Sequence, residues 1–206
     1  MIAIVDYGMG NLGSIHNMLQ RLGIVGISTK DPDQIRDAEK IILPGVGSFD
    51  QAMKNLNDLN LTGILNEKVQ KLKTPVLGIC LGMQLMTKDS QEGSLPGLGW
   101  INANTMRFNF LSLGPVLKIP HMGWNTLKIK KNVALLADLP LNPRFYFVHS
   151  YHVVCNDPLD IAATTDYGYD FISVLQHDNI YAVQFHPEKS HQFGMQVLKN
   201  FAQRPC

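Results

Sequence analysis

The sequence predicts an α/β fold with a twisted, mostly parallel central sheet, flanking helices and extra β-strands in the second half. In the first half, short apolar runs without alternation are separated by helical patterns. Such runs are typical of parallel strands that are buried on both faces. From about residue 104 onward, β-type runs follow one another closely. The chain has 206 residues, 45% of them hydrophobic, and no repeat or long linker, which favours a single domain over residues 1–206.

The first half alternates strand and helix patterns. Four apolar runs predict strands at residues 2–5, 24–27, 40–44 and 75–79. Helices are expected between and after them, at residues 10–23, at 49–73 in two pieces, and at 81–89. In the first of these helices, apolar residues recur with a helical period and Gly23 ends the pattern.

The second half is richer in β patterns. Strands are expected within residues 104–108, 114–120, 144–154, 160–165, 172–176 and 180–185. The basic group at 128–132 is interpreted as a solvated turn. A last helix is predicted over about 192–203, because Phe193, Val197, Leu198 and Phe201 fall on one helical face.

Composition excludes several functional classes. The net charge is +1, without a basic patch, so we expect no nucleic-acid partner. No apolar run approaches the roughly 20 residues of a membrane span, and the N-terminus resembles a first strand rather than a signal peptide. Three cysteines without C-x-x-C spacing indicate free thiols and a cytoplasmic location. Metal-binding spacings are absent, so we expect no metal and no cofactor.

The segment G-I-C-L-G at residues 78–82 is the first candidate for catalysis. It places Cys80 where a predicted strand meets a predicted helix, as in a nucleophile elbow with sulfur in place of the serine oxygen. The helix N-terminus favours a thiolate, and the N–H of Leu81 would point to a developing oxyanion. A buried structural cysteine beside two packing glycines is the alternative.

A thiolate nucleophile needs a base, and seven histidines compete for that role. Only His186 ends a strong strand pattern and has a carboxylate two residues later, at Glu188. In an extended segment those two side chains project to the same side, so Glu188 can orient the ring. A surface turn before the last helix is the alternative, and it is less convincing once G-I-C-L-G is considered.

The segment P-G-V-G at residues 44–47 follows a predicted strand and lets backbone approach a ligand closely. An N–H of Val46 or Gly47 could supply a second oxyanion donor. An ordinary strand-to-helix turn is the alternative. The segment lacks the form of a phosphate-binding P-loop.

These motifs together resemble the class I (triad) glutamine amidotransferases, whose fold is flavodoxin-like. Across the whole chain, five blocks resemble one branch, the glutaminase subunits of imidazole glycerol phosphate synthase: residues 6–15, 43–53, 120–125, 145–151 and 183–190. The resemblance implies that Cys80, His186 and Glu188 form the catalytic triad. It also implies that glutamine is hydrolysed through a glutamyl thioester, with Leu81 and the P-G-V-G loop as the oxyanion hole.

The resemblance further implies a substrate pocket. Gln84 and Glu92 match positions that hold glutamine, and His149, Ser150 and Tyr151 match a backbone segment that lines the same pocket. Each has a plain alternative: a solvated helix residue, a loop acid and a core strand, respectively. The resemblance implies a (β/α)8-barrel cyclase as heterodimer partner, which receives the ammonia. The block facing it would be His121, Met122, Gly123, Trp124 and Asn125.

Other functions remain open on sequence grounds. Residues 92–108 and 189–201 resemble a paralogous branch that feeds ammonia to an enzyme amidating a sugar of surface polysaccharide. A non-catalytic regulatory subunit with the same fold is a second alternative, and a cysteine peptidase is a third. We take the histidine-pathway glutaminase as the first interpretation.

Overall fold

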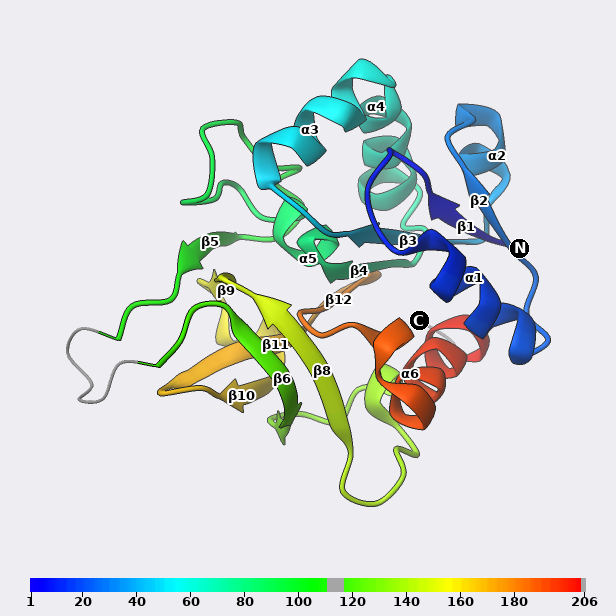
Figure 1. Ribbon diagram of the computed structural model, residues 1–206. Coiled ribbons are helices and arrows are strands. Elements are labelled where there is room, and N and C mark those ends of the chain that lie inside the picture. The colour runs from blue at the N-terminus through cyan, green and yellow to red at the C-terminus, as the bar shows by residue number, and fades with distance from the viewer. Residues whose placement is uncertain (111–116, 205–206) are drawn as a thin grey trace.

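A computed structural model describes residues 1–110 and 117–204, arranged around one large sheet (Figure 1). Parallel strands form its first part, in the spatial order Gly26–Thr29 (β2), Ile2–Val5 (β1), Lys40–Gly45 (β3), Val76–Cys80 (β4) and Ile180–Val183 (β12). The strand expected at 24–27 begins later, at Gly26. The reason is that the N–H of Ile24 still bonds to the carbonyl of Leu19 and completes the end of the preceding helix.

Antiparallel strands extend the sheet beyond β12. They are Asp170–His177 (β11), Ile161–Asp166 (β10) and Lys128–Ile129 (β7), with Tyr151–Cys155 (β9) and Ala103–Arg107 (β5) pairing to the side of β11. His121–Thr126 (β6) and Arg144–His149 (β8) form a separate two-stranded sheet. The run expected as one strand at 144–154 is therefore two strands, which separate at Ser150 and pair with different partners.

Some expectations for the second half need correction. Strand β6 was not predicted, and β7 lies where a solvated turn was expected. Of the strand expected at 114–120, residues 114–116 lie outside the described residues, and 117–120 are not in a strand. Cys206 also lies outside them, whereas Cys80 and Cys155 are free thiols.

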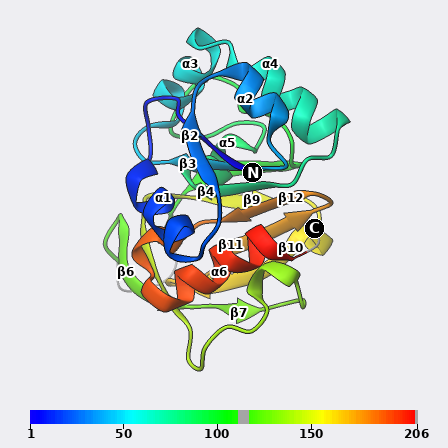
Figure 2. The ribbon, with the colours of Figure 1, turned by 90° about the vertical axis from the view of Figure 1, so that its right-hand side faces the viewer.

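Helices cover both faces of the sheet (Figures 1 and 2). Leu12–Arg21 (α1) and His191–Gln203 (α6) lie on one face, and Pro32–Asp37 (α2), Phe49–Asp58 (α3), Leu61–Asn66 (α4) and Leu81–Leu85 (α5) on the other. A π-helical turn, Glu67–Lys71, continues α4. Helix α2 was not predicted, although the Asp31 carboxylate caps it by accepting from the N–H of Asp33. None of the helices in the described ranges combines the length and apolar content needed to cross a membrane.

Burial alternates along the central strands. In β1, Ala3 and Val5 join the core beneath α2 to α5, while Ile2 and Ile4 join the core beneath α1 and α6. Both faces are thus buried, which explains the continuous apolar runs. The carboxyl ends of parallel strands meet at one edge of a sheet. Because Gly45 pairs with Cys80 and Ile79 with Val183, the segments after β3, β4 and β12 meet there.

Candidate active site

Cys80 occupies a strained turn between β4 and α5. Its φ of 54° and ψ of −108° lie in a region that residues with a side chain rarely adopt. Such strain persists only where the surrounding structure enforces it, and it is a feature of nucleophile elbows. The turn sets Sγ above the edge of the sheet and places the N–H of Leu81 in the first turn of α5.

The two glycines beside Cys80 are required by close backbone contacts. A Cβ on Gly82 would lie 1.8 Å from the carbonyl oxygen of Leu43, which is on β3. A Cβ on Gly78 would lie 2.9 Å from the backbone nitrogen of Met83. Real Cβ atoms do not approach backbone so closely, so glycine at 82 lets the turn pack against β3, and glycine at 78 lets β4 pack against the start of α5.

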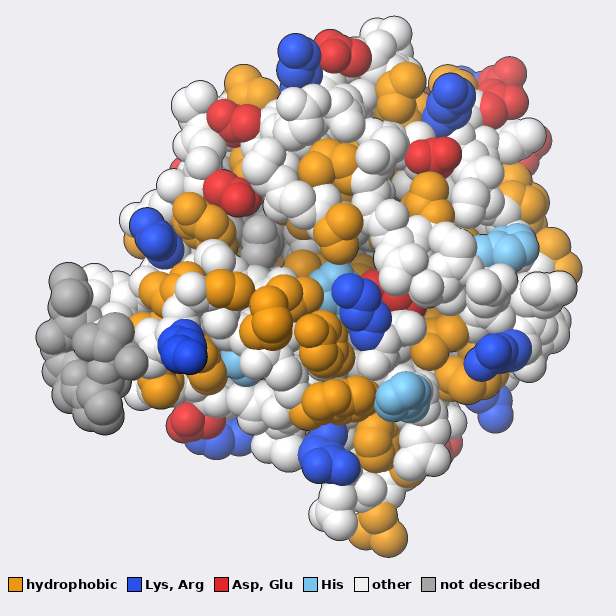
Figure 3. All heavy atoms as spheres, viewed as in Figure 1, with side chains coloured by type: hydrophobic (Ala, Val, Ile, Leu, Met, Phe, Trp, Pro, Cys, Tyr) orange, Lys and Arg blue, Asp and Glu red, His pale blue; other side chains and the backbone are white. Residues whose placement is uncertain are grey.

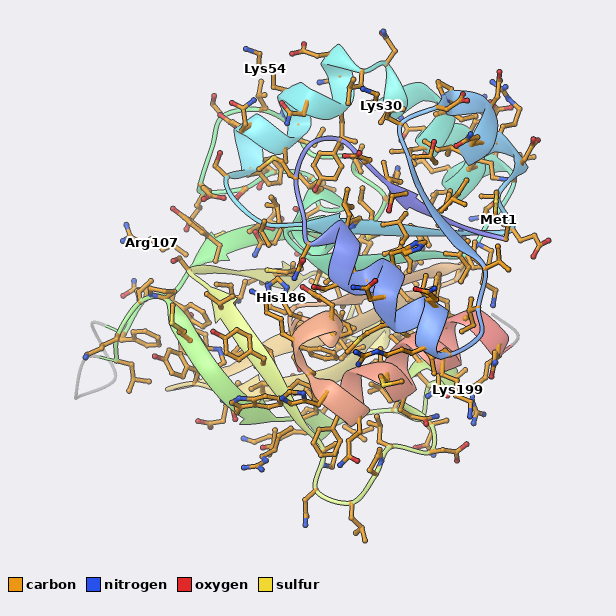
Figure 4. The ribbon with its side chains drawn as sticks, turned by 45° about the vertical axis from the view of Figure 1, so that its right-hand side comes forward. Met1, Lys30, Lys54, Arg107, His186 and Lys199 are labelled. Atoms are coloured by element: carbon orange, nitrogen blue, oxygen red, sulfur yellow. The ribbon has the colours of Figure 1, made fainter. Side chains whose placement is uncertain are left out.

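His186 and Glu188 follow β12 and lie in the interior. The N–H of His186 donates to the carbonyl of Tyr146 on β8, 2.9 Å away, and a short 3-10 helix, Pro187–Lys189, follows. Nδ1 of His186 lies 2.8 Å from Oε1 of Glu188, and each side chain is 1% exposed. Figure 4 shows His186 near the start of α6, well inside the molecule, whereas Arg107 and Lys199 lie at its periphery.

The electrostatics of His186 favour the protonated ring. Burial by itself lowers the pKa of His186, but the charge and hydrogen bonding of Cys80, followed by those of Glu188, raise it to about 10. Nε2 is buried and makes no hydrogen bond of ordinary geometry within the described residues, and of the two effects of Cys80 on the pKa of His186 the charge of its thiolate is the larger. An imidazolium beside a thiolate is the arrangement that activates a cysteine nucleophile.

The P-G-V-G loop lies next to Cys80 because Gly45 and Cys80 are register partners. Beneath the loop, the buried hydroxyl of Tyr7 donates to the carbonyl of Pro44. Burial, and secondly the charge of Cys80, raise the pKa of Tyr7 far above its usual range, so this hydroxyl stays a donor. Gly47 has a φ of 105°, which favours glycine.

A cavity of about 440 Å³ opens at this edge of the sheet. In Figure 3, hydrophobic side chains gather over β6 and β8 beside a hollow near the centre of the view. Ten of the predicted site residues line the cavity: Val46, Gly47, Cys80, Leu81, Gln84, Glu92, His149, Ser150, Tyr151 and His186. Glu188 does not line it and reaches it only through His186. The volume suits a small, polar substrate.

Two predicted substrate residues carry informative contacts. Oε2 of Glu92 accepts from the N–H of Phe49, the first residue of α3, 3.0 Å away. Burial raises the pKa of Glu92, although its carboxylate still faces the cavity. Nε2 of Gln84 donates to the carbonyl of Tyr151 at 3.0 Å. Gln84 is 4% exposed, which is incompatible with the alternative of a solvated helix residue.

The block 121–125 divides between surface and interior. Met122 is 62% exposed and Trp124 44% exposed, with Trp124 stacked on His191. His121 is instead buried, and its Nδ1 lies 3.1 Å from Nε2 of His149. Trp124 is thus not a core tryptophan. His121 is linked to the cavity through His149 rather than exposed on the surface.

Sequence reasoning missed several residues at the site. Pro120, Val148 and Lys189 line the cavity. Gln184 is fully buried, and its Nε2 lies 3.7 Å from Sγ of Cys80. Gln184 follows β12 directly, and its contact with Cys80 joins segments far apart in the sequence, so no local pattern marks it. Among the described residues, no group of three or more His, Cys, Asp or Glu side chains could hold a metal ion.

Comparisons with known proteins agree with this geometry. The family model described as glutamine amidotransferase class-I matches residues 3–204. The chain is 57% identical over 201 residues to "Imidazole glycerol phosphate synthase subunit HisH 2" of Methanococcus maripaludis, covering 98% of each chain. It is 44% identical over 203 residues to the protein of the same name in Pseudomonas aeruginosa, covering 98% of this chain and 99% of that one.

Solved structures show the same fold. The crystal structure of a putative GMP synthase protein from Thermoplasma acidophilum superposes with a TM-score of 0.71 at 21% identity, over 98% of this chain and 91% of that chain. The family match spans nearly the whole sequence, and the relatives are similar from end to end. The chain therefore belongs to the class I glutamine amidotransferase family.

Proposed function

We propose that this protein is the glutaminase subunit of imidazole glycerol phosphate synthase, acting as one domain in the cytoplasm. It hydrolyses glutamine to glutamate and passes the ammonia to a cyclase subunit in histidine biosynthesis. The observation that carries the proposal is the meeting of Cys80, at its strained turn, with the buried His186–Glu188 pair in one cavity. The names of relatives at 57% and 44% identity support the pathway.

In the proposed reaction, the thiolate of Cys80 attacks the side-chain amide carbon of glutamine. The N–H of Leu81 and one N–H of the P-G-V-G loop, from Val46 or Gly47, stabilise the oxyanion. Protonated His186 gives its proton to the leaving nitrogen, ammonia departs, and a glutamyl thioester remains. His186 then takes a proton from water, which attacks the thioester and releases glutamate. Glu188 holds the ring in the tautomer that both steps need.

Glutamine is held by groups that match its two ends. The carboxylate of Glu92 suits the α-ammonium group, because a charge-assisted hydrogen bond is stronger than a neutral one. Gln84 and the backbone of His149, Ser150 and Tyr151 line the rest of the cavity.

The partner we propose is a (β/α)8-barrel cyclase, bound as a heterodimer over the block 121–125. Met122 and Trp124 are large and exposed on β6, whose partner strand β8 carries Val148 and His149 of the cavity lining, and large aromatic residues are common anchors at interfaces. A partner seated there would cover the cavity mouth and receive the ammonia before it reaches water.

A second candidate keeps the chemistry and changes the acceptor. The names of both relatives carry the number 2, as is usual where one organism has two such proteins. A second copy is free to supply ammonia to a different enzyme, and residues 92–108 resemble a branch that serves a sugar-amidating enzyme. We place this candidate second because the block 120–125 resembles the histidine-pathway subunits.

Glutamate release should be measured for the purified chain alone, and with the cyclase of its own organism plus that cyclase's nucleotide substrate. Strong stimulation by the cyclase, absent in Cys80→Ala, is the expected result. Alkylation of Cys80 by a glutamine analogue without stimulation would keep the glutaminase and favour the sugar-amidating acceptor. Alkylation of Cys155 with loss of activity would overturn the site.

A further inference from the structure

Gln184 reaches the sulfur of Cys80 from the side away from the cavity. It directly follows β12, where Val183 is the register partner of Ile79, so Gln184 lies level with Cys80. Its side chain is fully buried and does not line the cavity. Nε2 of Gln184 lies 3.7 Å from Sγ of Cys80, which is hydrogen-bond distance for a sulfur acceptor. A substrate in the cavity therefore cannot touch Gln184, whereas the nucleophile does.

The neighbours of Gln184 determine which end of its amide faces the sulfur. The backbone carbonyl of Tyr151 can only accept, so the end of Gln84 that lies 3.0 Å from it must be the NH2 group. The same nitrogen lies 3.2 Å from the other amide, so the atom it meets there is Oε1 of Gln184. The remaining end of Gln184 is its NH2 group, and this group faces Cys80.

A second series of hydrogen bonds ends at the same carbonyl of Tyr151. The carbonyl of Tyr151 also accepts from Nδ1 of His149 at 2.8 Å, so both of its acceptor sites are filled. Nε2 of His149 then accepts from Nδ1 of His121 at 3.1 Å, and Nε2 of His121 lies 3.3 Å from Nδ2 of Asn125. These donors and the NH2 group of Gln84 converge on the carbonyl of Tyr151. Because that carbonyl can only accept, it fixes the orientation of Gln84 and, through Gln84, that of Gln184.

We propose that Gln184 is a further catalytic residue, whose side-chain amide donates an N–H to Sγ of Cys80 and stabilises the sulfur as a thiolate. A donor to the charged form of a buried group favours that form. The bond serves both halves of the reaction, since sulfur is negative before it attacks glutamine and again when it leaves the thioester. This proposal rests on the proposed role of Cys80 as the nucleophile.

Two substitutions at Gln184 test the donor. Gln184→Met keeps the length of the side chain and removes the N–H, and Gln184→Glu replaces the donor by an acceptor. Gln176→Met is the matched control, because Gln176 lies on the neighbouring strand β11, away from the cavity. The readouts are the rate of Cys80 alkylation by iodoacetamide at pH 7 and pH 10, and kcat and KM for glutamine in the complex with its cyclase.

For Gln184→Met we expect alkylation at pH 7 to fall by about tenfold or more, the loss of one hydrogen bond to a charged group. The rate at about pH 10 should be nearly normal, because most thiols are ionised there. Gln184→Glu should fall further at pH 7. In Gln184→Met, kcat should fall with KM almost unchanged, and Gln176→Met should match the unaltered protein in every readout.

Unchanged alkylation at pH 7 in folded Gln184→Met would overturn the proposal, and so would an equal loss at both pH values. If circular dichroism shows that the Gln184 variants are unfolded, Gln84→Leu replaces them. That variant frees the Gln184 amide without removing it and must also slow alkylation at pH 7. Iodoacetamide needs no glutamine site, so the test is separate from the proposed function. Glutamate release that persists in Cys80→Ser would instead overturn the proposed function.

Discussion

Oε1 of Glu188 lies 2.8 Å from Nδ1 of His186, and each side chain is only 1% exposed. A carboxylate accepts and cannot donate, so Nδ1 carries a hydrogen, and Nε2 is the atom left for the thiol. Burial makes this contact stronger than a surface pair and makes its loss more costly. The pair therefore fixes both the tautomer and the direction of the ring.

Glu188→Gln should lower kcat for glutamine by about a hundredfold or more, because the ring loses the partner that selects its tautomer and stabilises its charge. KM should change little, since Glu188 does not line the cavity. Asp160→Asn is a matched control, because Oδ1 of Asp160 makes a similar contact of 3.0 Å with Nδ1 of His177, away from the cavity. Steady-state kinetics would contradict the assignment if both variants lost activity equally.

Glu92→Gln should raise KM for glutamine by about tenfold or more, through loss of a charge-assisted hydrogen bond. The amide oxygen can still accept from the N–H of Phe49, so the start of α3 should stay in place. Glutamine saturation curves measure the effect. Glu39→Gln, which alters an exposed acid paired with the N-terminal ammonium group of Met1, should leave KM unaltered. An unchanged KM in Glu92→Gln would remove Glu92 from the substrate site.

Gly82→Ala should unfold the elbow and abolish glutamate release, because its Cβ would come within 1.8 Å of the carbonyl of Leu43. The backbone of β3 cannot move away from this Cβ without breaking its hydrogen bonds to the neighbouring strands. Gly13→Ala is the control: nothing lies within 4 Å of its new Cβ, and alanine should stabilise α1 by about 0.5–1 kcal/mol. Thermal unfolding and activity should separate the two, and a folded, active Gly82→Ala would contradict the packing.

The protein should lose stability as the pH falls below neutral. Burial lowers the pKa of His149 to about 3, and burial also lowers the pKa of His121 to about 4. An unfolded histidine titrates near 6.5, so below that pH the unfolded chain binds more protons than the folded protein and is stabilised relative to it. His149 alone should cost about 2 kcal/mol of stability between pH 7 and pH 5.

Guanidinium unfolding at pH 7, 6 and 5 checks this dependence. His149→Gln should flatten it, because the titrating group is gone. His16→Gln should retain it, since His16 is exposed on α1. Equal pH dependence in all three proteins would show that the buried histidines do not control acid unfolding.

The sequence was sufficient for the parallel part of the fold. In β1, β3 and β4 the apolar runs are buried on both faces, so hydrophobicity alone marks them. Strand β6 was not predicted, because only its first residue, His121, is buried and its apolar pattern is weak. The short helix α2 was not predicted, because a single fully buried apolar residue, Ile35, cannot show a helical period.

In the candidate site, too, some residues could be predicted from the sequence and others could not. Cys80 and His186 sit in short motifs whose local chemistry demands glycine or a nearby carboxylate, so they can be recognised in isolation. The contacts of Gln184 and Tyr7 join segments far apart in the sequence, so no local sequence pattern predicts them. The burial of the His121 side chain depends on the pairing of β6 with β8, which places His121 opposite His149.

Strand β12 lies between β4 and β11, so the final part of the chain enters the middle of the sheet. During synthesis the strand that ends in Cys80 leaves the ribosome long before the segment that carries His186 and Glu188. Until that segment inserts, the thiol has neither its base nor its amide donor, and the sheet has an open edge at β4. In the proposed reaction, completion of the fold and the start of catalysis therefore coincide, and we expect a nascent or truncated chain to consume no glutamine.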